Sequence, residues 1–179
     1  MNKYILLFLL LFTPVAYSVT ENETTPLNPL TPDNPFKKLG DQLKLNCKDV
    51  GNDSCTSRFI AMAACSFAYG VAESDKSFKE SLDIADELFA LLMRGNGLSI
   101  QNMFTKDHLV KESIRTETIE RVKKCETWTK KAVPKIVLER TGKPATPEFI
   151  EGATNTFGEW WLRSIEDIRK DAVTNYQKR

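Results

Sequence analysis

The sequence predicts an all-α fold, a compact bundle of about five helices stapled by two disulfides and preceded by a signal peptide and a proline-rich arm. Apolar residues recur at three- and four-residue steps through most of the chain, which is the period of one helix face. No window alternates cleanly between polar and apolar residues, as a half-buried strand would. Four cysteines follow a signal-like start, and an even number of cysteines in an exported chain usually forms disulfides.

Residues 1–18 have the layout of a secretory signal peptide. Lys3 supplies positive charge, residues 5–12 form an apolar run too short to span a bilayer comfortably, and residues 16–18 fit cleavage after Ser18. We therefore expect a periplasmic or secreted product. Because no later apolar run is long enough, we expect no stable membrane span once the signal is cleaved.

The rest of the chain divides into an arm, residues 19–35, and a single helical domain, residues 36–179. The arm is rich in Pro, Thr and Asn, and proline recurs every third residue from Pro26 to Pro35, the period of polyproline II. Two interpretations remain open. We favour a flexible, extended arm over a proline ligand for an aromatic groove in a partner.

Two helices are expected in the first part of the domain. Asn34-Pro35 fits the start of a short helix, because proline suits the first helical position. The next helix should start near Asp53 or Ser54 and run to about Val71. It is apolar almost all round, which predicts a central, buried helix.

A third helix should be capped by Ser74 or Asp75 and should end at Gly95-Asn96-Gly97. After a short segment, Thr105 should cap a long amphipathic helix that Pro134 ends or kinks. The last helix has a strong start, because a threonine cap, a proline and an acid follow one another from Thr146. It should carry an apolar stripe as far as Ala172.

Four cysteines allow three disulfide connectivities, of which we favour Cys47–Cys55 and Cys65–Cys125. Residues 51–53 are turn formers that suit the short loop of the first bond. The second bond would join two helices distant in sequence. The chain has no C-x-x-C motif and a single histidine, so we expect no metal site and no cofactor.

Charge excludes one class of partner. The formal net charge is +1, and Lys3 of the signal region accounts for it, so nucleic acid is not expected. Acids gather in residues 73–87 and bases in residues 121–143. Three interpretations stay open: solvated helix faces, two faces packed against each other, or steering surfaces for a charged partner.

No catalytic motif is present, so we assign no catalytic residue and regard an enzyme as the less favoured class. His108 follows an aspartate, the reverse of the order in secreted helical phospholipases. We favour an exposed helix-start histidine over a general base. Glu80-Ser81 and Glu112-Ser113 superficially resemble the Glu-Ser pair of lytic transglycosylases, but the aromatic and glycine motifs that should follow are missing.

Three places offer candidate partner-binding residues. The glycine loop after the third helix predicts either a protruding plug or an ordinary helix–helix turn, which we prefer. The basic segment holds a tryptophan that is either a binding hot spot or, in phase with Cys125, a core residue. Two adjacent tryptophans point about 100° apart on a helix, so one should face the core and the other a helix seam, a dimer contact or a ligand groove. The candidates are Gly95, Asn96, Gly97, Leu98, Trp128, Lys130, Lys131, Trp160 and Trp161.

Cys47, Cys55 and the stretch Phe67-Ala68-Tyr69-Gly70-Val71-Ala72, behind a secreted start, resemble the Rap/Tai class of helical periplasmic immunity proteins. Those proteins neutralise peptidoglycan-cleaving amidases delivered by type VI secretion. The resemblance covers about a third of the chain and carries over no functional residue, because a shared fold does not transfer a site.

The sequence therefore predicts an exported, non-enzymatic binding protein of the immunity or inhibitor type that blocks a protein partner, such as a cell-wall-degrading effector. A carrier of a small apolar ligand in a helical groove is the alternative. A peptidoglycan-acting glycosidase is the second alternative. A homodimer also stays open.

Overall fold

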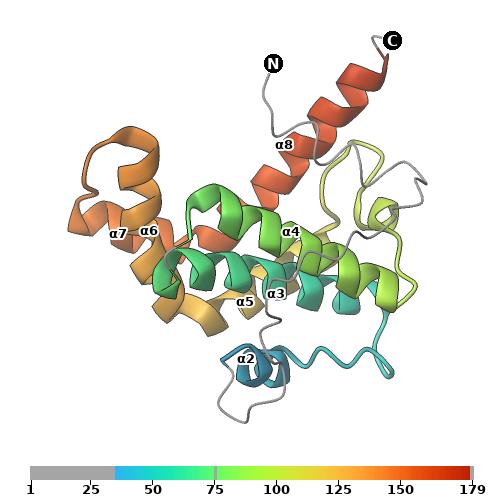
Figure 1. Cartoon of the computed structure of the whole chain (residues 1–179). Coiled ribbons are helices and arrows are strands. Elements are labelled where there is room, and N and C mark those ends of the chain that lie inside the picture. The colour runs from blue at the N-terminus through green and yellow to red at the C-terminus, as the bar shows by residue number, and fades with distance from the viewer. Residues whose placement is uncertain (1–34, 75, 178–179) are drawn as a thin grey trace, which may run out of the picture.

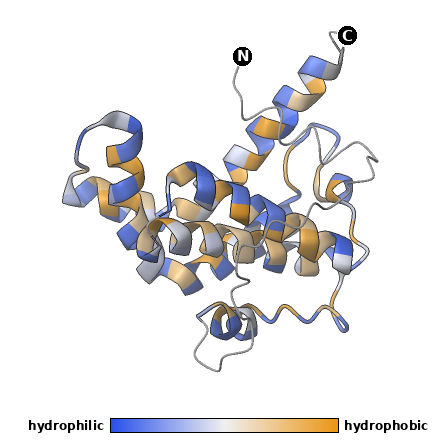
Figure 2. Ribbon diagram, in the orientation of Figure 1, coloured by the Kyte–Doolittle hydropathy of each residue, from blue (hydrophilic) through white to orange (hydrophobic). Residues whose placement is uncertain are grey.

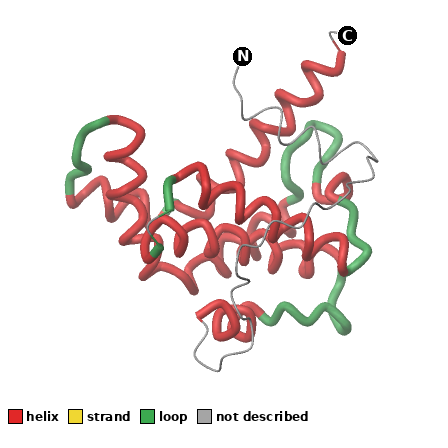
Figure 3. Tube along the Cα trace, in the orientation of Figure 1, coloured by secondary structure: helices red, strands yellow, loops and turns green. Residues whose placement is uncertain are grey.

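The computed structural model describes residues 35–74 and 76–177, and in this part of the chain helices joined by loops are the regular structure, with one isolated β-bridge (Figures 1 and 3). The expected all-α fold is confirmed. The signal peptide of residues 1–18 and residues 19–34 of the arm lie outside the described residues. The elements are α2 (Pro35–Leu43), α3 (Asn52–Glu73), α4 (Phe78–Gly95), η1 (Ile100–Met103), α5 (Glu112–Val122), η2 (Lys123–Cys125), α6 (Glu126–Thr141), α7 (Pro147–Asn155) and α8 (Phe157–Gln177).

Helix α3 is the centre of the bundle, as its apolar composition predicts. Every side chain from Cys55 to Ala68 is buried. Helices α4, α5 and α6 pack along α3, and Figure 2 shows the apolar residues concentrated on it and on the sides that face it. α3 has the length and mean hydropathy of a membrane span, but 94% of that window is buried inside the protein, as in a core helix.

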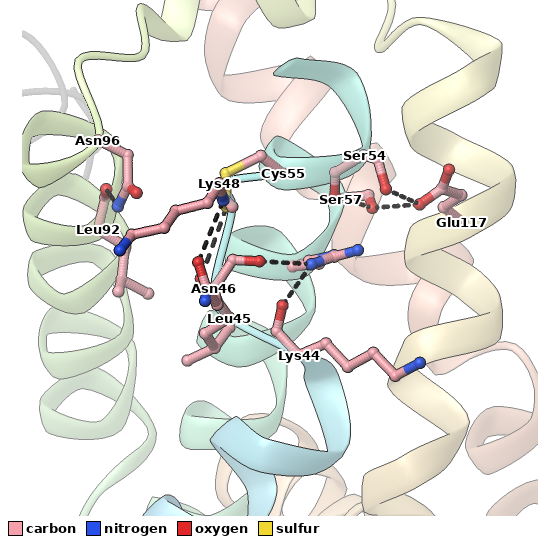
Figure 4. Close-up of a disulfide and its surroundings, with 12 residues drawn as sticks. Lys44, Leu45, Asn46, Lys48, Ser54, Cys55, Ser57, Leu92, Asn96 and Glu117 are labelled. Atoms are coloured by element: carbon pink, nitrogen blue, oxygen red, sulfur yellow. Dashed lines mark hydrogen bonds between the residues drawn. A yellow bond between two sulfur atoms is a disulfide. The ribbon is translucent and has the colours of Figure 1, made fainter. Parts of the chain in front are cut away.

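Both expected disulfides are confirmed. Cys47 in the loop after α2 bonds to Cys55 in the first turn of α3, with the Cα atoms 5.5 Å apart (Figure 4). Cys65 in the middle of α3 bonds to Cys125 directly before α6, with the Cα atoms 5.6 Å apart. The second bond therefore ties the central helix to the outer layer.

Helix α4 begins later than expected, because a capping box lies two to three residues beyond the predicted caps. Ser77 Oγ accepts from the Glu80 amide at 3.2 Å, and Glu80 Oε2 accepts from the Ser77 amide at 2.9 Å. Ser74 instead ends α3, where its hydroxyl donates to the Gly70 carbonyl. Asp75 lies outside the described residues. The predicted end of this helix at residues 95–97 is confirmed.

The predicted helix from Thr105 is wrong over its first turns. Residues 105–111 form a loop, and α5 begins only at Glu112. The amide of Val110 donates to Glu166 Oε1 on α8 at 2.8 Å, and the amide of Lys111 donates to the Met103 carbonyl at 2.9 Å. These long-range acceptors replace the helical ones, so His108 lies in a turn with φ 62° instead of a first helical turn.

Two later boundaries also differ from the prediction. The long helix breaks at η2, and α6 continues through Pro134 to Thr141, where Gly142 ends it with φ 69°. A proline interrupts one internal hydrogen bond, which the packed helix tolerates here. The predicted last helix starts at the expected Thr146 cap but divides into α7 and α8 at Thr156.

The two disulfides should differ in their contribution to stability. They close loops with sequence separations of 8 and 60 residues. In the chain-entropy model, replacing both cysteines of Cys65–Cys125 by alanine should lower the free energy of unfolding by about 4 kcal/mol, against about 2.5 kcal/mol for Cys47–Cys55. Guanidinium denaturation of the two double variants measures this order, and equal losses would contradict it.

Gly70 marks a close approach of α3 and α4. A Cβ at this position would lie 2.7 Å from Ser81 Oγ, whereas at Gly152 nothing lies within 4 Å. Gly70→Ala should therefore destabilise the fold by about 1–3 kcal/mol, because overpacking forces the helices apart. The control Gly152→Ala should stabilise by up to about 1 kcal/mol. Thermal and guanidinium unfolding measure both, and a neutral Gly70→Ala would show that the contact is not tight.

Candidate functional site

Two adjoining apolar grooves flank α8, and both are lined by Trp160 and Arg140. The first, here called the outer groove, measures about 660 Å³ and lies between α6, α7 and α8. The second, the inner groove, measures about 600 Å³ and lies between α4, α6 and α8. Both volumes fall in the range of small-ligand pockets, about 300–1,000 Å³. This surface is the candidate functional site.

The outer groove exists because α7 stands away from the core. This helix has no buried residue, and its small Gly152 and Ala153 form part of the groove wall. Phe149 at its start is 55% exposed although it lines the groove. Val133 and Ile136 of α6 complete an almost wholly apolar surface. An apolar patch of this kind is the usual mark of an interaction site.

The tryptophan pair divides between core and surface, as the offset of adjacent helical residues predicts. Trp161 is 4% exposed, and its ring centroid lies 5.3 Å from that of Phe67 on α3. Trp160 is 37% exposed and lies 5.5 Å from the ring of Phe157. Trp160 therefore has one face on the core and the other on the two grooves.

The end of α6 holds the start of α4 where the grooves meet. Glu139 Oε2 accepts from the amide of Phe78 at 3.1 Å. The guanidinium carbon of Arg140 lies 5.1 Å from the centroid of the Phe78 ring, a cation–π distance. Arg140 is nevertheless exposed, so its charge remains available at the edge of both grooves.

Asp86 on α4 is an acid in the wall of the inner groove. Burial, and then repulsion from Asp83, raise its pKa to about 7. Among the described residues no hydrogen bond or ion pair to its carboxyl is found within the usual distances. Asp86 is therefore a polar group without a counter-charge in a largely apolar surface.

Other carboxylates are occupied by structural contacts. Glu166, 5% exposed, accepts from the Val110 amide and pairs with Arg115. Glu117 accepts from the hydroxyls of Ser54 at 2.8 Å and Ser57 at 3.0 Å (Figure 4). The hydrogen bond from Arg121 is the largest cause that lowers the pKa of Glu117. These groups join α3, α5 and α8, and none of them faces a groove.

The glycine loop is a well-bonded turn. Leu98 donates its amide to the Met93 carbonyl at 2.9 Å, and Asn96 Nδ2 donates to the Leu92 carbonyl at 2.9 Å. Gly97 takes a φ of 65°, which glycine adopts freely. Leu98 packs against the core and is half-buried. The structure thus displays no large side chain at this turn, whose exposed residues are Gly95, Asn96 and Gly97.

Part of the basic segment packs against the end of α3. Lys131 pairs with Glu73 at 2.6 Å, and Lys135 donates to the Ala72 carbonyl at 2.8 Å. Trp128 is half-buried with its ring centroid 5.0 Å from Tyr69, so it belongs to the helix seam. Lys130 is exposed. The interpretation of two charged faces packed together therefore describes Lys131 and Glu73, whereas Lys135 bonds to a backbone carbonyl.

The residues weighed for catalysis do not come together in a cleft. Glu80 is taken up by the capping box, and the hydrogen bond from the Ser77 side chain is the first cause that lowers its pKa. Glu112 lies exposed on α5, where it contacts Thr116. Within residues 35–74 and 76–177, no group of three or more His, Cys, Asp or Glu side chains is placed to hold a metal ion.

Comparisons with protein-family models, with curated proteins and with solved structures gave no match to this chain. The geometry therefore carries the functional argument. Sequence reasoning selected Trp160 but missed Asp86, Arg140 and Phe149. A signal for Asp86 was present, because it stands in helical phase with Leu82 and Phe89 on the apolar stripe of α4.

Asp86→Asn should change how stability depends on pH. The folded pKa of about 7 exceeds the ordinary 3.8, so the folded state binds more protons and loses stability as pH rises from about 4 to 7. The free energy of unfolding of the variant should not show this loss. Relative to the parent, it should therefore increase by on the order of 2 kcal/mol from pH 5 to pH 8. Denaturation of both proteins at pH 5 and pH 8 measures the difference in their free energies of unfolding. A difference that is the same at both pH values would contradict the raised pKa.

Proposed function

We propose that this chain is an exported, non-enzymatic binding protein of the immunity or inhibitor type that engages a protein partner through the outer groove. One observation carries the proposal. Phe149, Trp160 and Arg140, which are residue types enriched in binding hot spots or in interface cores, are exposed around a single apolar groove.

The outer groove suits apolar side chains of a partner's helix or loop. Their entry would cover the exposed faces of Phe149 and Trp160 and release water from both surfaces, which is the main favourable term in association. Arg140 at the edge would meet an acidic or carbonyl group of the partner. Inhibition would follow because the bound bundle covers the partner's own working surface.

Export and partner class have separate support. Two disulfides are consistent with an oxidising compartment, where such bonds persist. The resemblance of Cys47, Cys55 and residues 67–72 to periplasmic immunity proteins suggests a peptidoglycan amidase as the partner to test first. Lys130, which is exposed on α6, is a further basic residue that could add charge attraction to such a contact.

A carrier of a small apolar ligand is the second candidate, and the volume of the outer groove favours it. About 660 Å³ of apolar space accommodates a drug-sized molecule. Native mass spectrometry of the protein purified from its own host separates the two functions. A reproducible added mass supports the carrier, whereas a bare chain in complex with a protein supports the inhibitor.

Capture of the partner should depend on the outer groove. Residues 19–179 are immobilised and exposed to an envelope extract of the host, or to a purified cognate amidase. Phe149→Ser should lower capture at least tenfold, because an exposed apolar anchor is lost. Gly152→Phe should do the same by filling the groove, since open space surrounds this position.

The matched control is Leu91→Ser. Leu91 on α4 is 54% exposed, against 55% for Phe149, but it does not line either groove. Capture by this variant should equal that of the parent chain. Equal capture by all variants would remove the outer groove from the mechanism, and recovery of the chain's own copy alone would assign it to a homodimer.

A further inference from the structure

The inner groove combines an apolar wall with a one-sided set of charges. Phe78 and Leu82 of α4 face Ile165 and Ile168 of α8 across it. Its charged lining consists of the carboxyls of Asp86, Glu139 and Asp167 and the single guanidinium of Arg140. The groove is thus apolar in its walls and acidic in its net charge.

The four charged groups are not equivalent. Arg140 lies over the Phe78 ring, and Glu139 accepts from the Phe78 amide. Asp167 is exposed on α8 and well solvated. Asp86 is half-buried, and among the described residues no ion pair to its carboxyl is found, because Arg140, the one cation in the groove lining, lies over the Phe78 ring. Below it, α3 and η1 present apolar side chains only, namely Ile60, Ala63, Ile100 and Met103.

A ligand that satisfies both features has an apolar body and one positive charge. Its body would cover the walls, and its ammonium group would supply the counter-charge that Asp86 lacks. The indole of Trp160 in the same groove adds an aromatic surface that attracts ammonium groups. An anionic amphiphile would face three carboxyls with one arginine to offset them.

We propose that the inner groove is a binding site for a small amphipathic cation, an alkyl or aryl amine whose ammonium group pairs with the carboxylate of Asp86. This site is separate from the partner contact of the outer groove. Gly152 and Phe149 line the outer groove alone, and Asp86 lines the inner one but not the outer. Each proposal therefore stands or fails by its own variants.

Binding should depend on pH through Asp86. Its pKa of about 7 means that the carboxyl is largely neutral at pH 5.5 and ionised at pH 8. Burial and Asp83 on its own helix raise this pKa, and the other charged groups that line the groove are Glu139 and Arg140 on α6 and Asp167 on α8. All of these acids favour a bound cation. A primary amine remains charged at both pH values.

Three probes with one apolar chain test the proposal: dodecylamine, 1-dodecanol and dodecanoate, each titrated below its micelle concentration into residues 19–179 by calorimetry. At pH 8, dodecylamine should bind at least tenfold more tightly than dodecanol, and dodecanoate most weakly. The preference for the amine should shrink several-fold at pH 5.5. Asp86→Asn should abolish the preference while leaving dodecanol binding unchanged.

Glu87→Gln is the matched control, because Glu87 is the next carboxylate along α4, is exposed and lines neither groove. It should retain the full preference for the amine. Equal affinity for the three probes, or an unchanged preference in Asp86→Asn, would overturn the proposal. Tightest binding of dodecanoate would overturn it as well and would assign the groove to anions held by Arg140.

Discussion

Helix α3 is buried on all sides through most of its length, so each helix that packs on it must present apolar side chains to it. The stretch from Cys55 to Ala68 is buried all round, so α4, α5 and α6 each contribute a stripe of fitting shape. Cys65–Cys125 holds the middle of this arrangement. The ends of α3 need polar partners, because terminal carbonyls lack helical donors. Lys135 supplies one to Ala72, and Lys131 adds positive charge at the negative end of the helix.

Local signals predicted those parts of the fold that local interactions determine. The Thr146 cap and the glycine turn at residues 95–97 depend on neighbours within a few residues. The loop at residues 105–111 does not, because the Val110 amide bonds to Glu166, 56 residues later in the chain. The predicted cap at Thr105 does not reveal that a distant carboxylate competes with the helical acceptor for the Val110 amide. Pro134 does not end its helix, one of the two outcomes that the sequence predicts, since packing of α6 on α3 outweighs the one bond that proline removes.

The tryptophan pair of the candidate site was predictable from the sequence, but the environments of Asp86 and Phe149 were not. Two adjacent helical tryptophans point about 100° apart, so the sequence alone predicted one in the core and the other at a helix seam, a dimer contact or a ligand groove. The raised pKa of Asp86 arises from burial among residues of α3, η1 and α8, and no local residue pattern reveals which distant elements meet there. The sequence predicts one apolar stripe along a single last helix, yet this helix breaks at Thr156, and Phe149 on α7 is exposed.

The placement of α7 is difficult to explain by stability alone. A helix of nine residues is too short to be stable in isolation, so α7 depends on its neighbours, and yet it buries no side chain. A threonine cap and a proline at its start maintain its shape at small cost. Its apolar side therefore adds little to the core and mainly widens the groove beside Trp160. α7 packs on α6 and α8 but leaves Phe149 exposed, so this helix contributes an ordered apolar surface to the groove without filling the core.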